Sequence, residues 1–127
     1  MNKDIYIILP YKESLLPKQA GAVSIYVKDT TKFSKYKKKI KIISSDNIDK
    51  SKIFRNRNYI LNFCKQNKNR KINIIEINNR PEYVNYISKY FPNAKINLIF
   101  HNDPLSLRGS INYSERESIL LKCNKII

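Results

Sequence analysis

Four short apolar runs constrain the fold of this chain of 127 residues more than any other feature. They span residues 5–9, 40–43, 72–77 and 96–100, and a fifth begins at residues 126–127. Each run is rich in β-branched residues and nearly apolar throughout, which is typical of strands buried on both faces of a parallel sheet. The runs therefore predict the strands of one buried sheet.

The segments between these runs have the apolar spacing of helices. The positions that follow this spacing are Val23, Tyr26, Val27 and Thr30 with Phe33 beside them, then Ile60, Phe63 and Cys64, then Tyr83, Ile87, Tyr90 and Phe91. Pro81 suits the first position of the third helix and Pro92 ends it, while Ser114–Glu117 forms a capping box before a fourth helix containing Ile119, Leu120 and Leu121. The alternation of strands and helices predicts an α/β layer structure with right-handed crossovers around a parallel sheet.

The chain stops two residues into its fifth apolar run. A strand this short, with no helix after it to cover its side of the sheet, is an unusual end for a domain. We therefore expect residues 1–127 to be one domain and the N-terminal fragment of a longer protein. The alternative is a short fifth strand at the edge of the sheet.

The charge is strongly positive, with 25 lysines and arginines against 10 acidic residues and a formal net charge of +15. Such an excess makes nucleic acid or an anionic surface a candidate partner. However, 19 of the cations are lysines, and they occur with 21 isoleucines and 16 asparagines, a combination typical of an AT-rich genome. This bias would spread lysine over any tolerant surface, so nucleic acid is the less favoured partner. The basic run Lys35–Lys41 fits a solvated connection or a patch for anionic lipid or nucleic acid.

Several protein classes find no support in the sequence. No apolar run is long enough to cross a bilayer, and the N-terminus is too short and too charged for a secretory signal. Cys64 and Cys123 lack metal or redox spacing and fall on apolar helix faces. With one histidine in the chain, a structural zinc site or Ser/His/Asp or Cys/His catalysis has no local support. We expect a cytoplasmic protein with no bound metal or cofactor.

Polar residues gather where the predicted strands end, and ligands of open α/β sheets bind beyond the carboxyl ends of the strands. The residues at these ends are Tyr11–Glu13 with the following loop to Gly21, Ser44–Asp46, Asn78–Arg80 and His101–Asp103. This distribution predicts a site at one edge of the sheet.

Each candidate at this edge has a functional and a structural interpretation. His101 suits a hydroxyl or phosphate ligand, or it caps the strand end by bonding Asp103 or a backbone carbonyl. Gly21 begins a helix and could form an anion cradle, or it could serve close packing alone. Arg80 could bind a carboxylate or phosphate through two parallel hydrogen bonds, or be solvated. Glu13 could accept from sugar hydroxyls or be a free loop carboxylate, and Asp103 is a ligand or a turn former.

Five stretches of the chain resemble the N-terminal domain of family 4 glycosyltransferases. They are residues 5–13, 21–26, 79–83, 99–104 and the pair 114–116 with 123–127, and the resemblance covers essentially the whole chain. It implies a GT-B architecture, in which two Rossmann-like domains face a cleft. This chain would supply one such domain, with a parallel sheet of about five strands. The resemblance also implies sugar transfer with retention of anomeric configuration and no bound metal.

The resemblance implies roles for particular residues. Gly21 and Ala22 lie in the loop that approaches the acceptor and the donor phosphate, often through a Gly-Gly pair that this sequence lacks. His101 would contact the transferred sugar as the catalytic residue, and Asn102 and Asp103 follow it in the same motif. Arg80 would lie in a loop on the acceptor side, and Glu13, the candidate for sugar hydroxyls, ends the first matching stretch. The nucleotide-sugar would be held mainly by a C-terminal domain that is absent from this chain.

The function expected from this resemblance is transfer of a sugar to a glycan or lipid-linked acceptor during surface polysaccharide or lipopolysaccharide synthesis. The domain would lie in the cytoplasm, where its basic surface would dock it to an anionic inner membrane face, and it would be inactive alone. Two alternatives remain: a basic nucleic-acid-binding module, and a non-catalytic remnant of the transferase fold.

Overall fold

The computed structural model describes residues 4–18, 20–47 and 55–127, so part of the polar stretch 44–58 and the N-terminal Met1–Lys3 lie outside the described residues. Five parallel strands form one sheet in the order β2-β1-β3-β4-β5. The strands are β1 Ile5–Ile8, β2 Ile40–Ile43, β3 Ile74–Asn78, β4 Lys95–Ile99 and β5 Lys125–Ile126. The Rossmann-like α/β class expected from the sequence is confirmed.

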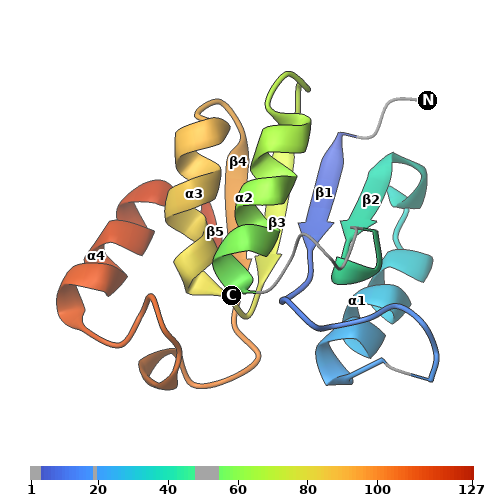
Figure 1. The fold of residues 1–127 in the computed structure, drawn as a ribbon, viewed down its shortest axis with the longest axis horizontal. Helices are drawn as coiled ribbons and strands as arrows, with labels where there is room; N and C mark the ends of the chain where they lie inside the picture. Colours follow the sequence, from blue (N-terminus) through green and yellow to red (C-terminus); the bar gives the residue numbers. More distant parts are fainter. Residues whose placement is uncertain (1–3, 19, 48–54) are drawn as a thin grey trace.

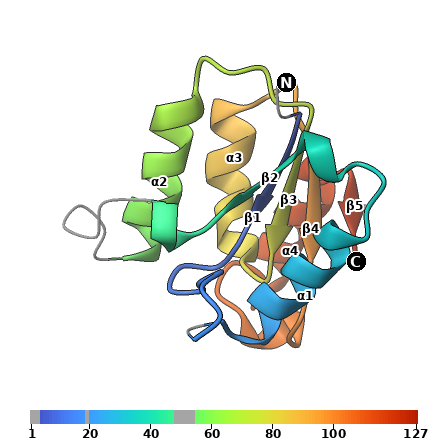
Figure 2. The ribbon, with the colours of Figure 1, turned by 90° about the vertical axis from the view of Figure 1, so that its right-hand side faces the viewer.

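Four helices connect the strands and lie on both faces of the sheet. They are α1 Ala22–Lys32, α2 Asn56–Asn67, α3 Val84–Tyr90 and α4 Tyr113–Lys122. In Figure 1, α2 and α3 lie in front of the sheet and α4 lies beyond β5. Figure 2, a quarter turn away, shows α1 on the opposite side of the sheet from α2 and α3. Short 3₁₀ helices occupy Lys37–Lys39, Ser45–Asn47, Pro81–Tyr83 and Pro104–Ser106.

Alternate residues of the strands supply the two cores. Tyr6 and Ile8 of β1 point to the larger cluster, which includes the fully buried Phe63 of α2 and Ile87 of α3. Ile7 points the other way, toward α1. Burial on both faces explains why the strand sequences are nearly apolar throughout.

The buried hydroxyl of Tyr59 fastens α2 to the sheet. Its oxygen lies 2.8 Å from the carbonyl oxygen of Leu9 and 3.1 Å from that of Ile43, so its one proton is shared between these two acceptors. These carbonyls follow β1 and end β2, so one side chain holds both strand ends at the carboxyl edge of the sheet. A buried polar group needs such partners to offset its desolvation.

The prediction of which α1 residues pack against the sheet is partly wrong. Val23 and Val27 are buried as expected, but Tyr26 and Thr30 are exposed, and Phe33 is 81% exposed after the end of the helix. The reason is that α1 packs only on the part of the sheet formed by β1 and β2. A narrow stripe of apolar residues on the helix is enough to cover that area. Tyr26 instead packs edge-on against His101.

The start of α4 also differs from expectation. The capping box is formed by Asn112 and Glu115, not by Ser114 and Glu117. Asn is as good an N-cap as Ser, and Glu115 stands at the third helical position from which it can reach back to the Asn112 amide. In this helix Ile119 is buried, while Leu120 and Leu121 are 69% and 80% exposed.

The first residues of β3 and of α3 also differ from expectation. The third strand begins at Ile74, not Ile72, although Ile72 is buried just before it. Tyr83 belongs to the 3₁₀ helix that begins at Pro81, and α3 starts one residue later. Cys64 is buried, and Cys123 is half-buried against the same core.

Candidate functional site

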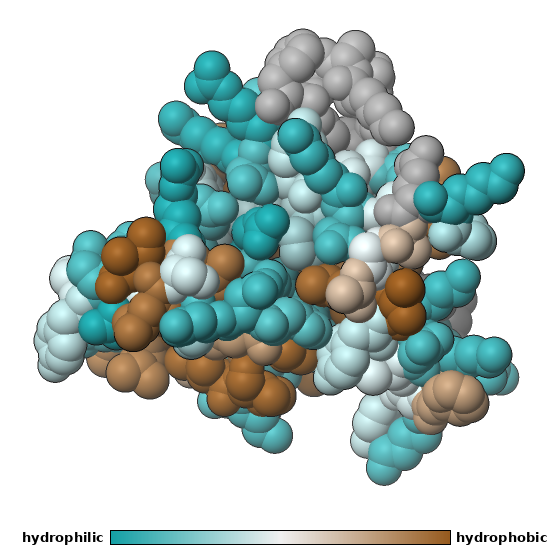
Figure 3. Space-filling model, turned by 90° about the horizontal axis from the view of Figure 1, so that it is seen from below, coloured by the Kyte–Doolittle hydropathy of each residue, from teal (hydrophilic) through white to brown (hydrophobic). Residues whose placement is uncertain are grey.

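The carboxyl ends of the five parallel strands form one rim, at the bottom of Figure 1. The chain passes from β1 outward to β2 and then crosses back to β3, so the direction of winding reverses between β1 and β3. Ligands of open α/β sheets bind at this kind of reversal. Figure 3 views the rim from below and shows hydrophilic residues over much of it, with hydrophobic residues gathered toward one side.

Glu13 occupies the N-terminal end of α1. Gly21 caps this helix with an extended backbone (φ −88°, ψ −177°), and a Cβ there would lie 2.8 Å from each Glu13 carboxylate oxygen. The buried Ser24 donates its hydroxyl to the same carboxylate at 2.5 Å. A carboxylate at this position is stabilised by the positive end of the helix dipole. The expected anion cradle is therefore filled by the chain's own carboxylate, and the turn offers a hydrogen-bond acceptor.

His101 follows β4 and is held from two sides. Its Nε2 lies 2.9 Å from Oδ1 of Asn78, the last residue of β3. The Asn78 amide nitrogen faces Glu76 instead, at 3.5 Å. Because an amide oxygen only accepts, Nε2 carries the proton of the neutral ring and Nδ1 is left as an acceptor. The ring of Tyr26 packs edge-on against the imidazole, with 5.0 Å between centroids.

Glu13 and His101 lie close enough to interact electrostatically. Desolvation lowers the pKa of His101 from 6.5, and the negative charge of Glu13 opposes this shift. Glu13 also touches the Gly21 turn. The structure thus brings Gly21, Glu13 and His101 to the same part of the rim, with Ser24 and Tyr26 supplied by α1.

This arrangement predicts the titration of the only histidine. We expect the pKa of His101 to lie below 6.5 and Glu13→Gln to lower it further, because the substitution removes the charge that favours the imidazolium. A ¹H NMR titration of the ring protons measures both values. Glu117→Gln, on the exposed face of α4, is the matched control and should leave the pKa unchanged. An unchanged pKa in Glu13→Gln would show that the carboxylate is not beside the ring.

Asn79 joins the loops that follow β3 and β4. It is buried and has a left-handed backbone (φ 56°). Its Oδ1 accepts from the amides of His101 and Asn102, both at 3.1 Å, and its Nδ2 donates to Oδ1 of Asn102 at 2.7 Å. Asn79 therefore positions the backbone of His101.

The other predicted site residues have mainly structural contacts in this structure. Ala22 is the exposed first residue of α1 and carries no polar side-chain group. Asn102 is exposed and held by Asn79. Asp103 accepts from the amide of Leu105 at 2.9 Å and so caps the 3₁₀ helix, which is the turn-forming role considered for it. The His101 side chain bonds Asn78, neither Asp103 nor a backbone carbonyl.

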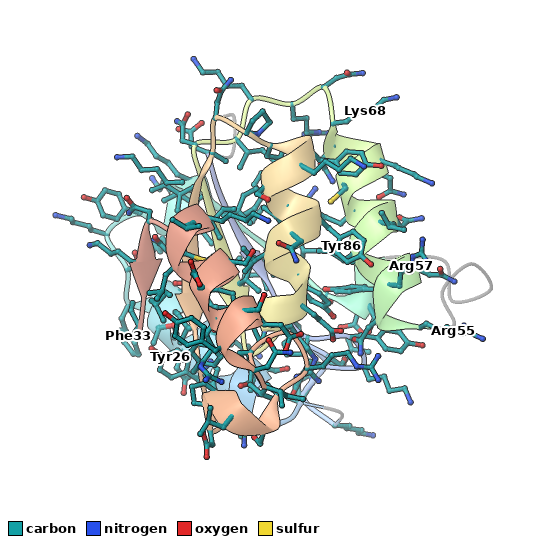
Figure 4. All side chains as sticks on the ribbon, turned by 90° about the vertical axis from the view of Figure 1, so that its left-hand side faces the viewer. Tyr26, Phe33, Arg55, Arg57, Lys68 and Tyr86 are labelled. Carbon is teal, nitrogen blue, oxygen red and sulfur yellow. The ribbon has the colours of Figure 1, made fainter. Side chains whose placement is uncertain are left out.

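Arg80 lines a second site, a pocket of about 640 Å³. The residues around this pocket are Tyr11, Lys12, Arg55, Asn56, Arg57, Arg80, Glu82, Tyr83, Tyr86 and Arg108. Figure 4 places Arg55 and Arg57 at the N-terminal end of α2 and Tyr86 on the neighbouring α3. Of these described lining residues five are cationic and one is acidic, so this part of the pocket is strongly electropositive.

Tyr83 organises this pocket. Its buried hydroxyl accepts from the amide of Tyr11 at 3.1 Å and donates to Asn56 Oδ1 at 2.9 Å, which ties the loop after β1 to the start of α2. Arg80 Nη1 donates to the carbonyl of Asn79 at 2.8 Å. Burial raises the pKa of Glu82, and the charges of Arg108 and Arg80 oppose this shift.

Comparisons with protein-family models, curated proteins and solved structures found no match to this chain. Within residues 4–18, 20–47 and 55–127, no group of three or more histidine, cysteine, aspartate or glutamate side chains is arranged to hold a metal ion. None of the helices in the same ranges combines the length and the apolar character needed to cross a membrane. The parallel five-stranded sheet defines a Rossmann-like α/β domain, and two polar sites lie at its carboxyl rim.

Proposed function

We propose that this domain is the acceptor side of a retaining glycosyltransferase, which transfers a sugar from a nucleotide-sugar to a glycan or lipid-linked acceptor in surface polysaccharide or lipopolysaccharide synthesis. The observation that carries the proposal is the meeting of Gly21, Glu13 and His101 at one part of the rim. The family resemblance assigns Gly21 and His101 to the sugar-transfer site, and Glu13 is the carboxylate suited to sugar hydroxyls. The nucleotide-sugar would be held mainly by a second domain.

The side chains at this part of the rim suit sugar hydroxyls. The Glu13 carboxylate accepts hydrogen bonds and is already oriented by Ser24. His101 Nδ1 is an acceptor on a ring fixed by Asn78 and Tyr26. A lowered pKa keeps the imidazole neutral at pH 7, so its acceptor nitrogen stays available.

In the reaction, these groups would orient and polarise the substrate. Glu13 would accept the hydrogen bond of an acceptor hydroxyl, and its negative charge would favour the oxocarbenium character that develops on the transferred sugar. Prepositioned charges of this kind stabilise a transition state without reorganisation cost at the moment of reaction. His101 would hold a sugar hydroxyl and so align donor with acceptor.

Sugar binding to the isolated chain tests this proposal. We expect methyl hexosides, titrated into ¹⁵N-labelled chain, to shift the amide signals of Gly21, Ser24 and His101. Glu13→Gln should weaken binding by roughly tenfold, because one hydrogen bond to a charged acceptor is lost. Asn93→Ala, at an exposed turn before β4, is the matched control. Shifts that avoid the rim for every hexoside, or that persist unchanged in Glu13→Gln, would contradict the proposed site.

The proposal includes a cytoplasmic domain that docks on an anionic membrane face through its net charge of +15. The exposed 3₁₀ helix Lys37–Lys39 is a concentrated part of that charge. We expect sedimentation with phosphatidylglycerol vesicles to increase with anionic lipid content and to fall in Lys37→Gln/Lys39→Gln, because each lysine near such a surface contributes about 1 kcal/mol. Binding that ignored the anionic lipid content would contradict this part of the proposal.

A further inference from the structure

We propose that the pocket lined by Arg55, Arg57, Arg80 and Arg108 binds a phosphate monoester or diphosphate carried by the acceptor. This inference rests on the proposed function, because it names the class of acceptor. The phosphate could belong to a soluble phosphorylated sugar or to a lipid-linked one, and both present the same anionic group to the pocket.

The distribution of arginine supports a specific site. The chain has 19 lysines and only six arginines, and four of those six line this one pocket. Lysine serves a solvated surface as well as arginine does. The two are not equivalent where a planar fork must meet a phosphate or carboxylate through two hydrogen bonds. In a chain so biased toward lysine, arginines concentrated at one place indicate that the fork is needed there.

The positive charges of the pocket outnumber the negative charge beside them. Arg55, Arg57 and Arg108 are exposed, and their guanidinium groups form no hydrogen bond with the residues that the structure describes. Among the lining residues that the structure describes, Glu82 is the one acidic residue, and Lys12 adds a fifth cation. The first turn of α2 has no acidic residue and no side-chain cap, so the positive end of the helix dipole adds to the same field.

The pocket adjoins the hydroxyl site through consecutive residues. Lys12 lines the pocket while its neighbour Glu13 contacts the Gly21 turn. Arg80 lines the pocket while its neighbour Asn79 bonds the backbone of His101. One ligand could therefore place a hydroxyl beside Glu13 and a phosphate among the arginines. The Gly21 turn is the less suitable phosphate site because the Glu13 carboxylate already occupies it.

Isothermal titration calorimetry with inorganic pyrophosphate and with glycerol 3-phosphate tests the pocket. The informative variants are Arg57→Lys, Arg108→Lys and the double variant, which keep the charge but remove the fork, at positions exposed enough to leave the fold intact. We expect each single variant to weaken binding about tenfold and the double variant to weaken it further. Arg70→Lys, an exposed arginine outside this pocket, is the control and should bind as the wild type does.

Equal affinities in the wild type and the double variant would overturn the inference, because binding would then follow net charge alone. Vesicles containing phosphatidic acid distinguish the two sources of phosphate. Selective binding to these vesicles over phosphatidylglycerol vesicles, lost in the double variant, would support a lipid-linked acceptor. Binding of glycerol 3-phosphate alone would support a soluble one. Tighter binding of single-stranded DNA, unaffected by the double variant, would overturn the inference in favour of a nucleic-acid surface.

Failure of this inference can be told apart from failure of the proposed function. Loss of hexoside binding at Gly21 and His101, with pyrophosphate binding intact, would remove the transferase proposal and leave an anion site. Hexoside binding at the rim with no arginine-dependent phosphate binding would retain the transferase proposal and remove the phosphorylated acceptor.

Discussion

Alanine at position 109 is expected to lower the free energy of unfolding by about 2–3 kcal/mol. Gly109 has a φ of +99°, a region that residues with a side chain rarely adopt. A Cβ there would also lie 2.5 Å from the backbone nitrogen of Glu82 and 2.7 Å from its Cα. These are backbone atoms of the 3₁₀ helix that starts at Pro81, so they cannot yield without moving that helix.

The same substitution should weaken the arginine pocket. Gly109 follows Arg108, and the next residue, Ser110, is buried with its hydroxyl bonded to the carbonyls of Pro104 and Leu107. The loop is therefore fixed on one side of Gly109 and lies against Glu82 on the other. An added methyl group would push Arg108 away from Glu82, and we expect pyrophosphate affinity to fall with stability.

Gly21→Ala is the matched control, since the chain has only these two glycines. Gly21 has a negative φ, and its added Cβ would meet the end of the flexible Glu13 side chain. We expect this variant to lose less than about 1 kcal/mol. Urea denaturation followed by circular dichroism measures both variants. A loss in Gly109→Ala no larger than that in Gly21→Ala would contradict the packing described for the loop.

His101→Ala is expected to lower the rate of sugar transfer by about 10² to 10³, the range seen when one prepositioned hydrogen-bonding group is removed from an active site. The rate is measured on the protein encoded by the complete reading frame, with nucleoside diphosphate release as the readout. His101 is only half-buried, so the variant should fold. Asn93→Ala, at the opposite edge of the sheet from the rim, should retain the wild-type rate. Equal rates in His101→Ala and the wild type would remove the role assigned to the imidazole.

Local sequence was sufficient to predict the sheet and much of the larger core. A strand buried on both faces is apolar at nearly every position, and runs such as 40–43 and 96–100, with Lys41 and Asn97 as their only polar residues, approach that condition without help from distant residues. Helix faces were less predictable. Tyr26 and Leu121 fit an apolar stripe, yet both are exposed, because the sheet area available to each helix is set by the fold as a whole.

The candidate site was predictable only in part, for a related reason. Polar residues after each strand indicate the rim, since all parallel strands end at the same edge. Which of them meet depends on the strand order β2-β1-β3-β4-β5, which places the loops after β1 and β3 side by side. Arg55 caps the start of α2, Arg57 lies in its first turn and Arg108 lies in the loop before α4, so no local pattern joins them to Arg80. The scarcity of arginine was the one signal in the sequence that could have drawn attention to them.

The contact between the Glu13 carboxylate and the turn at the start of α1 could not be predicted from the sequence either. Gly21 and Glu13 are separated by a loop, and the sequence shows only that a glycine begins a helix. The backbone angles of Gly21 are open to any residue, so backbone conformation does not explain the glycine. The close approach of the Glu13 carboxylate does.

Nucleotide-sugar turnover tests the central claim most directly, because the claim is that this rim is half of a sugar-transfer site. The measurement compares the 127-residue chain with the product of the complete reading frame, using a panel of nucleotide-sugars and phosphorylated acceptors. We predict no turnover by the chain alone. The complete protein should release nucleoside diphosphate and form a product that keeps the donor's anomeric configuration. Turnover by the isolated chain, or a complete protein that transfers no sugar from any donor, would contradict the account.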